Sequence, residues 1–115
     1  MHLKFKKDGS ELIVSLTGEL DHHSAEEVRV KIDDRIDRDG IKNLILDFSS
    51  VTFMDSSGIG VVIGRYKKLT RKNGKVFIAG ASKNVERVFQ LSGLYKIIGA
   101  YGSIEEVARC SNQEE

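Results

Sequence analysis

The residues best suited to chemistry in this chain are the Asp-Ser-Ser-Gly run at positions 55–58. The run follows an apolar stretch at 51–54 and precedes apolar residues at helical spacing. A serine at a helix start lies beside backbone N–H groups without partners and at the positive end of the helix dipole, where added negative charge is favoured. Ser56 or Ser57 is therefore a candidate for phosphorylation, which adds about −1.5 to −2 charges. Such a run also caps helices without any further role.

A catalytic role for these serines has less support. A serine nucleophile needs a general base within hydrogen-bond reach, and the three histidines are His2, His22 and His23. The last two fall at the start of the first expected helix and could approach the serines in space. However, the Gly-x-Ser-x-Gly elbow of hydrolases is absent, and adjacent histidines on a helix make a poor metal pair. We therefore expect neither an enzyme nor a metal site.

The glycines after the serines do not complete a nucleotide-binding motif. No Gly-Lys-Ser/Thr follows Gly60, and a Rossmann pattern would need glycine or alanine where the chain has Ile63. The end of the same helix carries a basic run: Arg65, Lys67, Lys68, Arg71, Lys72 and Lys75. Cations stabilise a helix C-terminus, so a solvated face is the default interpretation, and a docking surface for an acidic partner is the minority one.

The elements that must position the serines alternate along the chain. Apolar alternation predicts strands at 3–6 and 11–17, joined by an Asp-Gly turn, and the second strand ends at Gly18. A helix begins near Asp21, or at Ser24 with Glu27 as a capping box, and ends at Gly40. The remaining expected elements are a strand at 44–48, the apolar patch 51–54, a helix to 73–74, a strand at 76–79, a helix to 92–93, a strand at 97–101 and a helix from 103.

The order β-β-α-β-α-β-α-β-α predicts an α/β fold with a mostly parallel sheet and an antiparallel hairpin at its start. The 115 residues are expected to form one domain, 1–115. A net charge of +1 argues against direct nucleic-acid binding. The single cysteine, Cys110, forms no disulfide framework. No leader sequence or membrane-spanning run is recognisable, so we expect a cytoplasmic protein.

Three blocks of the chain, 16–26, 53–67 and 88–98, closely resemble the anti-sigma factor antagonists with a STAS domain. Their separation also fits, so the resemblance covers nearly the whole chain and implies the STAS fold. Blocks 21–23 and 64–67 resemble most closely the sporulation branch of the family in endospore-forming bacteria. One small departure is Ser24, where a threonine is expected.

The resemblance implies a mechanism. The unphosphorylated protein binds an anti-sigma factor, which is also an ATP- and magnesium-dependent serine kinase, and thereby releases a sigma factor. Phosphorylation at Ser56 ends this binding, and a serine phosphatase restores it. The chain itself then needs no cofactor, and Ser57 is the competing phosphoacceptor. Residues expected to contact the partner are Asp21, Asp55, Ser57, Gly58 and Ile59. The alternative functions are a ligand or nucleotide sensor of the STAS type and, more distantly, a serine hydrolase.

Overall fold

The structure, a computed structural model, describes the backbone of residues 1–113 and the side chains of residues 1–108. Residues 114–115 of the predicted domain and the thiol of Cys110 lie outside this description. The strands are β1 (His2–Asp8), β2 (Glu11–Leu20), β3 (Asn43–Met54), β4 (Lys75–Ala79) and β5 (Gly99–Tyr101). The helices are α1 (Ala25–Asp39), α2 (Ser56–Thr70), α3 (Lys83–Ser92), α4 (Ile104–Gln113) and the 3-10 turn η1 (Leu94–Lys96).

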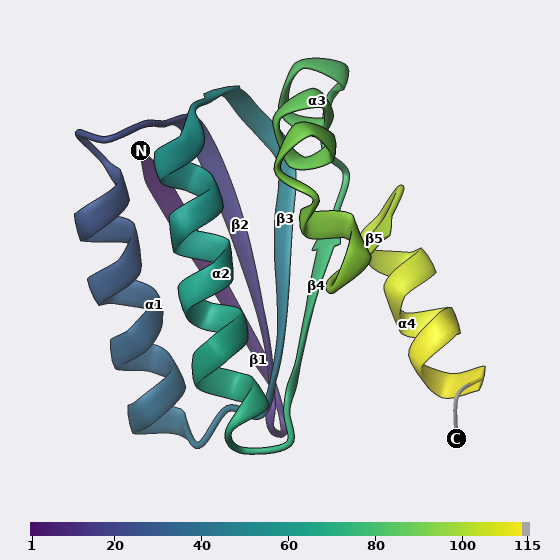
Figure 1. The fold of residues 1–115 in the computed structure, drawn as a ribbon. Coiled ribbons are helices and arrows are strands. Elements are labelled where there is room, and N and C mark those ends of the chain that lie inside the picture. Colours follow the sequence, from purple (N-terminus) through teal and green to yellow (C-terminus); the bar gives the residue numbers. More distant parts are fainter. Residues whose placement is uncertain (114–115) are drawn as a thin grey trace.

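The strands form one sheet in the order β1-β2-β3-β4-β5. β1 and β2 are antiparallel, whereas β2, β3, β4 and β5 are mutually parallel. The predicted hairpin and mostly parallel sheet are therefore confirmed, and η1 is the one element that was not predicted. The helices α1, α2 and α3 cover one face of the sheet, and α4 packs near its β5 edge on the other face (Figure 1).

Several strand ends differ from the prediction, and β5 begins at Gly99 and not at residue 97, after the turn η1. β2 does not stop at Gly18 but continues to Leu20, because this glycine adopts a positive φ of 115° next to an irregularity in the pairing with β3. The patches predicted at 44–48 and 51–54 belong to one continuous strand, β3. Its exposed Ser49 and Ser50 interrupt the apolar pattern but not the strand. Both strands therefore reach the same edge of the sheet, where the predicted serines begin.

The predicted helix ends are confirmed at Gly40 and Gly93, both in the left-handed conformation. The prediction that the second helix continues to 73–74 is wrong, because α2 ends at Thr70 with Arg71 as its C-cap. The predicted capping box at the start of α1 is not formed. Ser24 is the N-cap but makes no side-chain capping hydrogen bond, and its hydroxyl instead donates to the carbonyl of Glu19 at 2.9 Å. The turn before α1 is closed by Asp21, whose Oδ1 accepts the N–H groups of His23 and Ser24.

The two edges of the sheet are differently built. The outer edge of β1 carries exposed lysines at positions 4, 6 and 7. The opposite edge is formed by β5, which has only three residues and pairs with Phe77–Ala79 of β4. Among the helices that the structure describes, none combines the length and the apolar character needed to cross a membrane.

Candidate functional site

The junction of β3 with α2 holds the candidate phosphoacceptor. Ser56 is the first residue of α2 and its side chain is exposed. Asp55 is the N-cap in an extended conformation, and its Oδ1 accepts the N–H of Ser57 at 2.8 Å. This bond satisfies one of the free donors at the helix start. Asp55 thus fixes the first turn of α2 while the hydroxyl of Ser56 stays accessible at the positive end of the helix dipole.

Gly58 allows α2 to begin this close to the sheet. A Cβ atom at this position would overlap the side chain of Met54 and would lie 3.1 Å from Leu20 Cδ2. The next residue, Ile59, is only 8% exposed and belongs to the core. The close approach at Gly58 and the buried side chain of Ile59 therefore fix the first turn of α2, and with it Ser56, against the sheet. Their predicted contact with a partner stays a prediction, and any such contact would depend on the outer backbone of the first helical turn.

Asp21 reaches the same edge of the sheet from the neighbouring strand. β2 and β3 are parallel with Leu20 paired to Met54, so Asp21 and Asp55 each follow the last residue of a strand. Desolvation raises the pKa of the Asp21 carboxyl, but backbone N–H groups of Ser24 and His23 donate to it and lower the pKa overall. The pairing of β2 with β3 therefore places the acidic positions 21 and 55 and the two serines at the same edge of the sheet.

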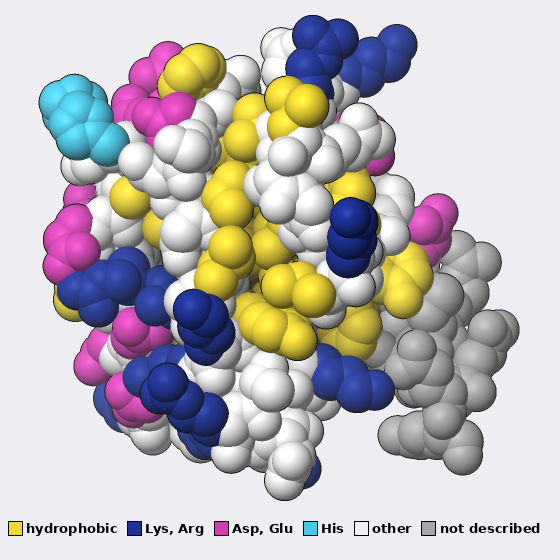
Figure 2. Space-filling model, in the orientation of Figure 1, with side chains coloured by type: hydrophobic (Ala, Val, Ile, Leu, Met, Phe, Trp, Pro, Cys, Tyr) yellow, Lys and Arg dark blue, Asp and Glu magenta, His cyan; other side chains and the backbone are white. Residues whose placement is uncertain are grey.

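A shallow acidic hollow lies on the α1 side of this edge. Its volume is about 350 Å³, and it is lined by Met1, Glu19, Asp21, His23, Ser24 and Glu27. Figure 2 shows acidic side chains and the histidines together over the start of α1. Among the residues that the structure describes, no group of three or more His, Cys, Asp or Glu side chains is placed to hold a metal ion.

Sequence analysis did not single out several exposed apolar side chains, among them Phe53 and Leu91. Phe53 is 50% exposed at the end of β3, three residues before Ser56, and Leu91 is 83% exposed on α3. The strand period gave a signal for Phe53, because it must point away from its buried neighbour Met54. Helix spacing gave one for Leu91, which falls off the stripe made by the buried Val85 and Phe89.

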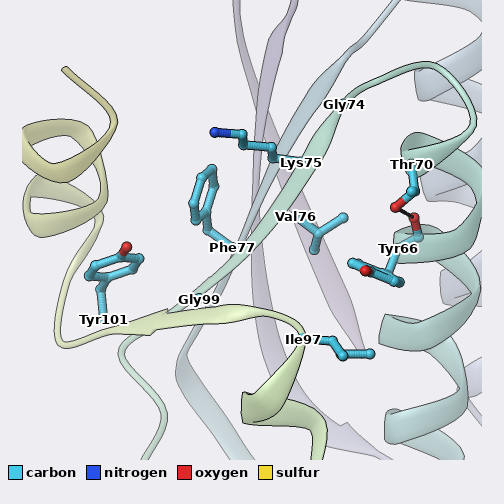
Figure 3. A pocket seen from close by; sticks show the side chains of 9 residues that line it. All are labelled: Tyr66, Thr70, Gly74, Lys75, Val76, Phe77, Ile97, Gly99 and Tyr101. Carbon is cyan, nitrogen blue, oxygen red and sulfur yellow. Dashed lines mark hydrogen bonds between the residues drawn. The ribbon is translucent and has the colours of Figure 1, made fainter. Parts of the chain in front are cut away.

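A separate cavity of about 360 Å³ lies at the other end of α2 (Figure 3). Tyr66 and Thr70 of α2 form one wall, and the hydroxyl of Thr70 donates to the carbonyl of Tyr66 at 2.7 Å. Val76 and Ile97 approach from the opposite side. Ser56 does not line this cavity. The cavity is therefore distinct from the edge of the sheet that carries Asp21, Asp55, Ser56 and Ser57, which we call the serine edge.

Comparison with protein families identifies a STAS domain over residues 2–107. An anti-sigma F factor antagonist of Paenibacillus polymyxa is 42% identical over 90 residues, which cover 78% of this chain and 77% of the relative. The chain is thus similar, over most of its length, to a protein named for antagonism of an anti-sigma factor.

Solved structures of SpoIIAA share the fold. The unphosphorylated form of this anti-sigma factor antagonist has 32% sequence identity and a TM-score of 0.83, covering 96% of this chain and 97% of that chain. The phosphorylated form of SpoIIAA, a Bacillus cell fate determinant, has 32% identity and a TM-score of 0.74, covering 95% of this chain and 99% of that chain.

Proposed function

The chain belongs to the STAS-domain family of anti-sigma factor antagonists, and from this premise we propose that it is a binding module switched by phosphorylation at Ser56. In the unphosphorylated state it binds an anti-sigma factor and so releases a sporulation sigma factor. The observation that carries the proposal is the exposed Ser56 hydroxyl at the first position of α2. The existence of SpoIIAA in unphosphorylated and phosphorylated forms supports it by similarity.

The proposed switch needs no refolding of the domain. A kinase transfers the terminal phosphoryl group of ATP to the Ser56 oxygen, which loses its proton, and ADP leaves. The product carries about −1.5 to −2 charges at the helix start. Free N–H groups there tolerate the phosphate locally, whereas an acidic or apolar partner surface is repelled or left with a desolvated charge. Asp21 and Asp55 at the same edge strengthen this repulsion.

In this proposal the partner proteins, and not this chain, carry out the phosphorylation and dephosphorylation. The anti-sigma factor acts as the serine kinase and brings ATP and magnesium, a phosphatase removes the phosphate, and all of these proteins act in the cytoplasm. Neither His22 nor His23 bonds to the Ser56 hydroxyl within the described part of the chain, which supports a phosphoacceptor rather than a nucleophile. We therefore propose a binding protein and not an enzyme.

Intact-mass analysis and peptide mapping test the phosphorylated residue. The protein is mixed with its cognate anti-sigma factor and Mg-ATP, and we expect one added phosphate on Ser56 that is lost in Ser56→Ala. The matched control is Ser57→Ala, which removes the neighbouring hydroxyl but leaves the N–H that Asp55 binds. Phosphate on Ser57 would keep the mechanism and correct the site. No phosphate with a kinase of proven activity would contradict the switch.

Calorimetric titration tests the effect on binding. Ser56→Asp places a negative charge at the start of α2, and we expect it to weaken binding of the anti-sigma factor by tenfold or more, about 1.4 kcal/mol. Ser56→Asn is the uncharged control of similar size. Equal affinity of Ser56→Asp, of stoichiometrically phosphorylated protein and of wild type would contradict the proposal.

A further inference from the structure

The flank of α2 that begins at Ser56 faces α3 and not α1. On the α1 side, Arg65 and Lys68 contact Asp33 and Asp37 of α1. On the other side, Tyr66 and Thr70 line the cavity shared with Ile97. At 100° per residue, Ser56 and Ile63 fall on the same flank as Tyr66 and Thr70. The candidate phosphoacceptor therefore stands at one end of the surface between α2 and α3.

The facing flank of α3 is apolar. Glu86 lines a cavity with Ala100 and Gly102, which places that side of α3 toward β5. Val88 is on the opposite side of the helix and so lies toward α2, whereas Leu91 lies between that side and the outer, solvent-facing surface of α3. Val88 packs on the core, whereas Leu91 is 83% exposed. Figure 2 shows hydrophobic side chains in a band along the junction of α2 with α3 and η1. We call this surface the α2–α3 groove.

The groove leads to a pocket of a size that accepts a side chain. Ile97, which follows η1, is 51% exposed and approaches Tyr66 across the cavity of about 360 Å³ (Figure 3). Val76 forms its floor on the sheet side. Pockets that take one large apolar side chain commonly anchor protein–protein interfaces. The α2–α3 groove thus combines an open apolar band with a pocket beside Tyr66.

Basic side chains border the groove. Lys67 is next to Tyr66, Arg87 is one helical turn before Leu91, and Lys96 precedes Ile97. All three are exposed, and none forms an ion pair with a residue that the structure describes. Lys and Arg side chains flank the hydrophobic band in Figure 2, while the acidic side chains lie mainly over α1. Charge complementarity therefore favours a partner segment with an apolar face and acidic flanks.

We propose that the α2–α3 groove docks an acidic amphipathic helix of the anti-sigma factor, with one large apolar side chain in the pocket beside Tyr66. This inference rests on the proposed function and extends its interface. A stable interface covers about 800 Å² per partner, more than the few side chains around Ser56 supply, and Ile63 and Tyr66 of the groove lie on the same flank of α2 as that serine. Phosphate on Ser56 then stands at the end of the groove and repels the acidic helix directly.

Calorimetric titration with the anti-sigma factor tests the groove. We expect Leu91→Asp to weaken binding at least tenfold, because it removes an apolar contact and adds a charge of the helix's own sign. Arg87→Glu should also weaken binding, and raising the salt concentration should reduce wild-type affinity more than that of Arg87→Glu. The matched control is Val30→Asp, since Val30 is 50% exposed on α1, outside the groove. We expect its affinity to stay within twofold of wild type.

The outcomes separate the two proposals. If wild type binds the anti-sigma factor and Leu91→Asp binds it with an affinity within twofold of wild type, docking in the α2–α3 groove is contradicted, and the proposed function is not. If wild type does not bind the anti-sigma factor at all, both the proposed function and the docking in the α2–α3 groove are contradicted. A photo-cross-linking amino acid at position 91 identifies the occupant: a cross-link to an acidic helix of the anti-sigma factor supports the inference. A cross-link to a second copy of this chain, or to a non-acidic segment, overturns it.

Discussion

Arg65 is the charged side chain that departs most from its predicted environment. The sequence placed it in a solvated basic run, but it is only 5% exposed between α1 and α2. Its Nε lies 2.7 Å from Asp33 Oδ1, yet the N–H is not directed at that oxygen, and Nη1 has no hydrogen-bond partner in the described structure. Desolvation lowers the pKa of Arg65, while Asp33 opposes the shift. Charge attraction therefore holds this pair more than hydrogen-bond geometry does.

Removing one partner of this pair should be costly. Arg65→Ala removes the nearer cation of Asp33 in a site of low polarity and leaves the more distant Arg29, whose Nη1 lies 3.6 Å from Asp33 Oδ2. We expect a loss of about 2 kcal/mol in unfolding free energy. This is below the value for fully buried pairs because Asp33 is 20% exposed and partly screened by water. The double variant Arg65→Met with Asp33→Leu should recover most of the loss. Urea denaturation followed by circular dichroism measures both.

Arg38→Ala is the matched control, because Arg38 pairs with Asp34 on the exposed face of α1. Its unfolding free energy should change far less than that of Arg65→Ala. Similar losses in the two variants would mean that Arg65 contributes through packing of its apolar stem alone.

Among the individual residues, sequence analysis singled out those of the serine edge but not the exposed apolar residues Leu91 and Ile97. Positions 21, 55, 56 and 57 were found because a capping residue and an exposed hydroxyl leave a local signal in the sequence. Leu91 leaves only the signal that it falls off the apolar stripe of its helix. Ile97 leaves none, because apolar residues are normally assigned to the core until the packing of neighbouring elements is known. Whether the named residues contact a partner stays a prediction.

α2 contains two glycines that packing within this chain does not require. A Cβ atom at Gly60 or Gly64 would have no neighbouring atom within 4 Å. Glycine in a helix interior costs about 0.5–1 kcal/mol relative to alanine. Gly58, in contrast, is required by the close approach of Met54. α2 therefore contains one glycine that close packing requires and two that packing does not require.

Alanine substitutions should separate these glycines. Gly60→Ala and Gly64→Ala should each raise the unfolding free energy by about 0.5–1 kcal/mol. Gly58→Ala should lower it by about 1–3 kcal/mol, because the added methyl group displaces Met54. Thermal unfolding of the three variants provides the measurement. A stabilised Gly58→Ala protein would show that the start of α2 moves away from the sheet without cost.

Element order was predictable because apolar periodicity changes clearly between strands and helices along this chain. Strand ends were less predictable. The extension of β2 past Gly18 depends on its pairing with β3, a long-range contact that local residue preferences do not contain. The start of α1 was ambiguous for a similar reason, since the Ser24 hydroxyl bonds to Glu19 of β2 and not to its own helix.

Across the whole molecule, the sheet separates two hydrophobic cores of unequal size. The larger lies beneath α1, α2 and α3. The smaller lies on the opposite face, where the fully buried Val107 of α4 packs with Ile45, Phe77 and Ala79. Ser56 belongs to the larger side through α2, whereas the pocket of the α2–α3 groove is also lined by Phe77 and Tyr101 of the smaller side. Docking of α4 should therefore be separable from the proposed function.

Val107→Ala tests this separation. We expect a loss of about 1–2 kcal/mol from the smaller core and faster amide hydrogen exchange at 104–108, with the rate of Ser56 phosphorylation unchanged. Val62→Ala is the control in the larger core, since Val62 is also fully buried but lies in α2. It should increase exchange in α2 itself. A Val107→Ala protein that is phosphorylated more slowly would contradict the separation.

The two sheet edges described above bear on aggregation. An exposed strand edge is a template for pairing with another chain, and proteins block it with charged side chains or by keeping the edge strand short. β1 carries lysines at positions 4, 6 and 7, and β5 offers only three residues. Neither edge favours strand addition, so the molecule is protected from polymerising through its sheet. The surfaces that remain for recognition are those of its helices.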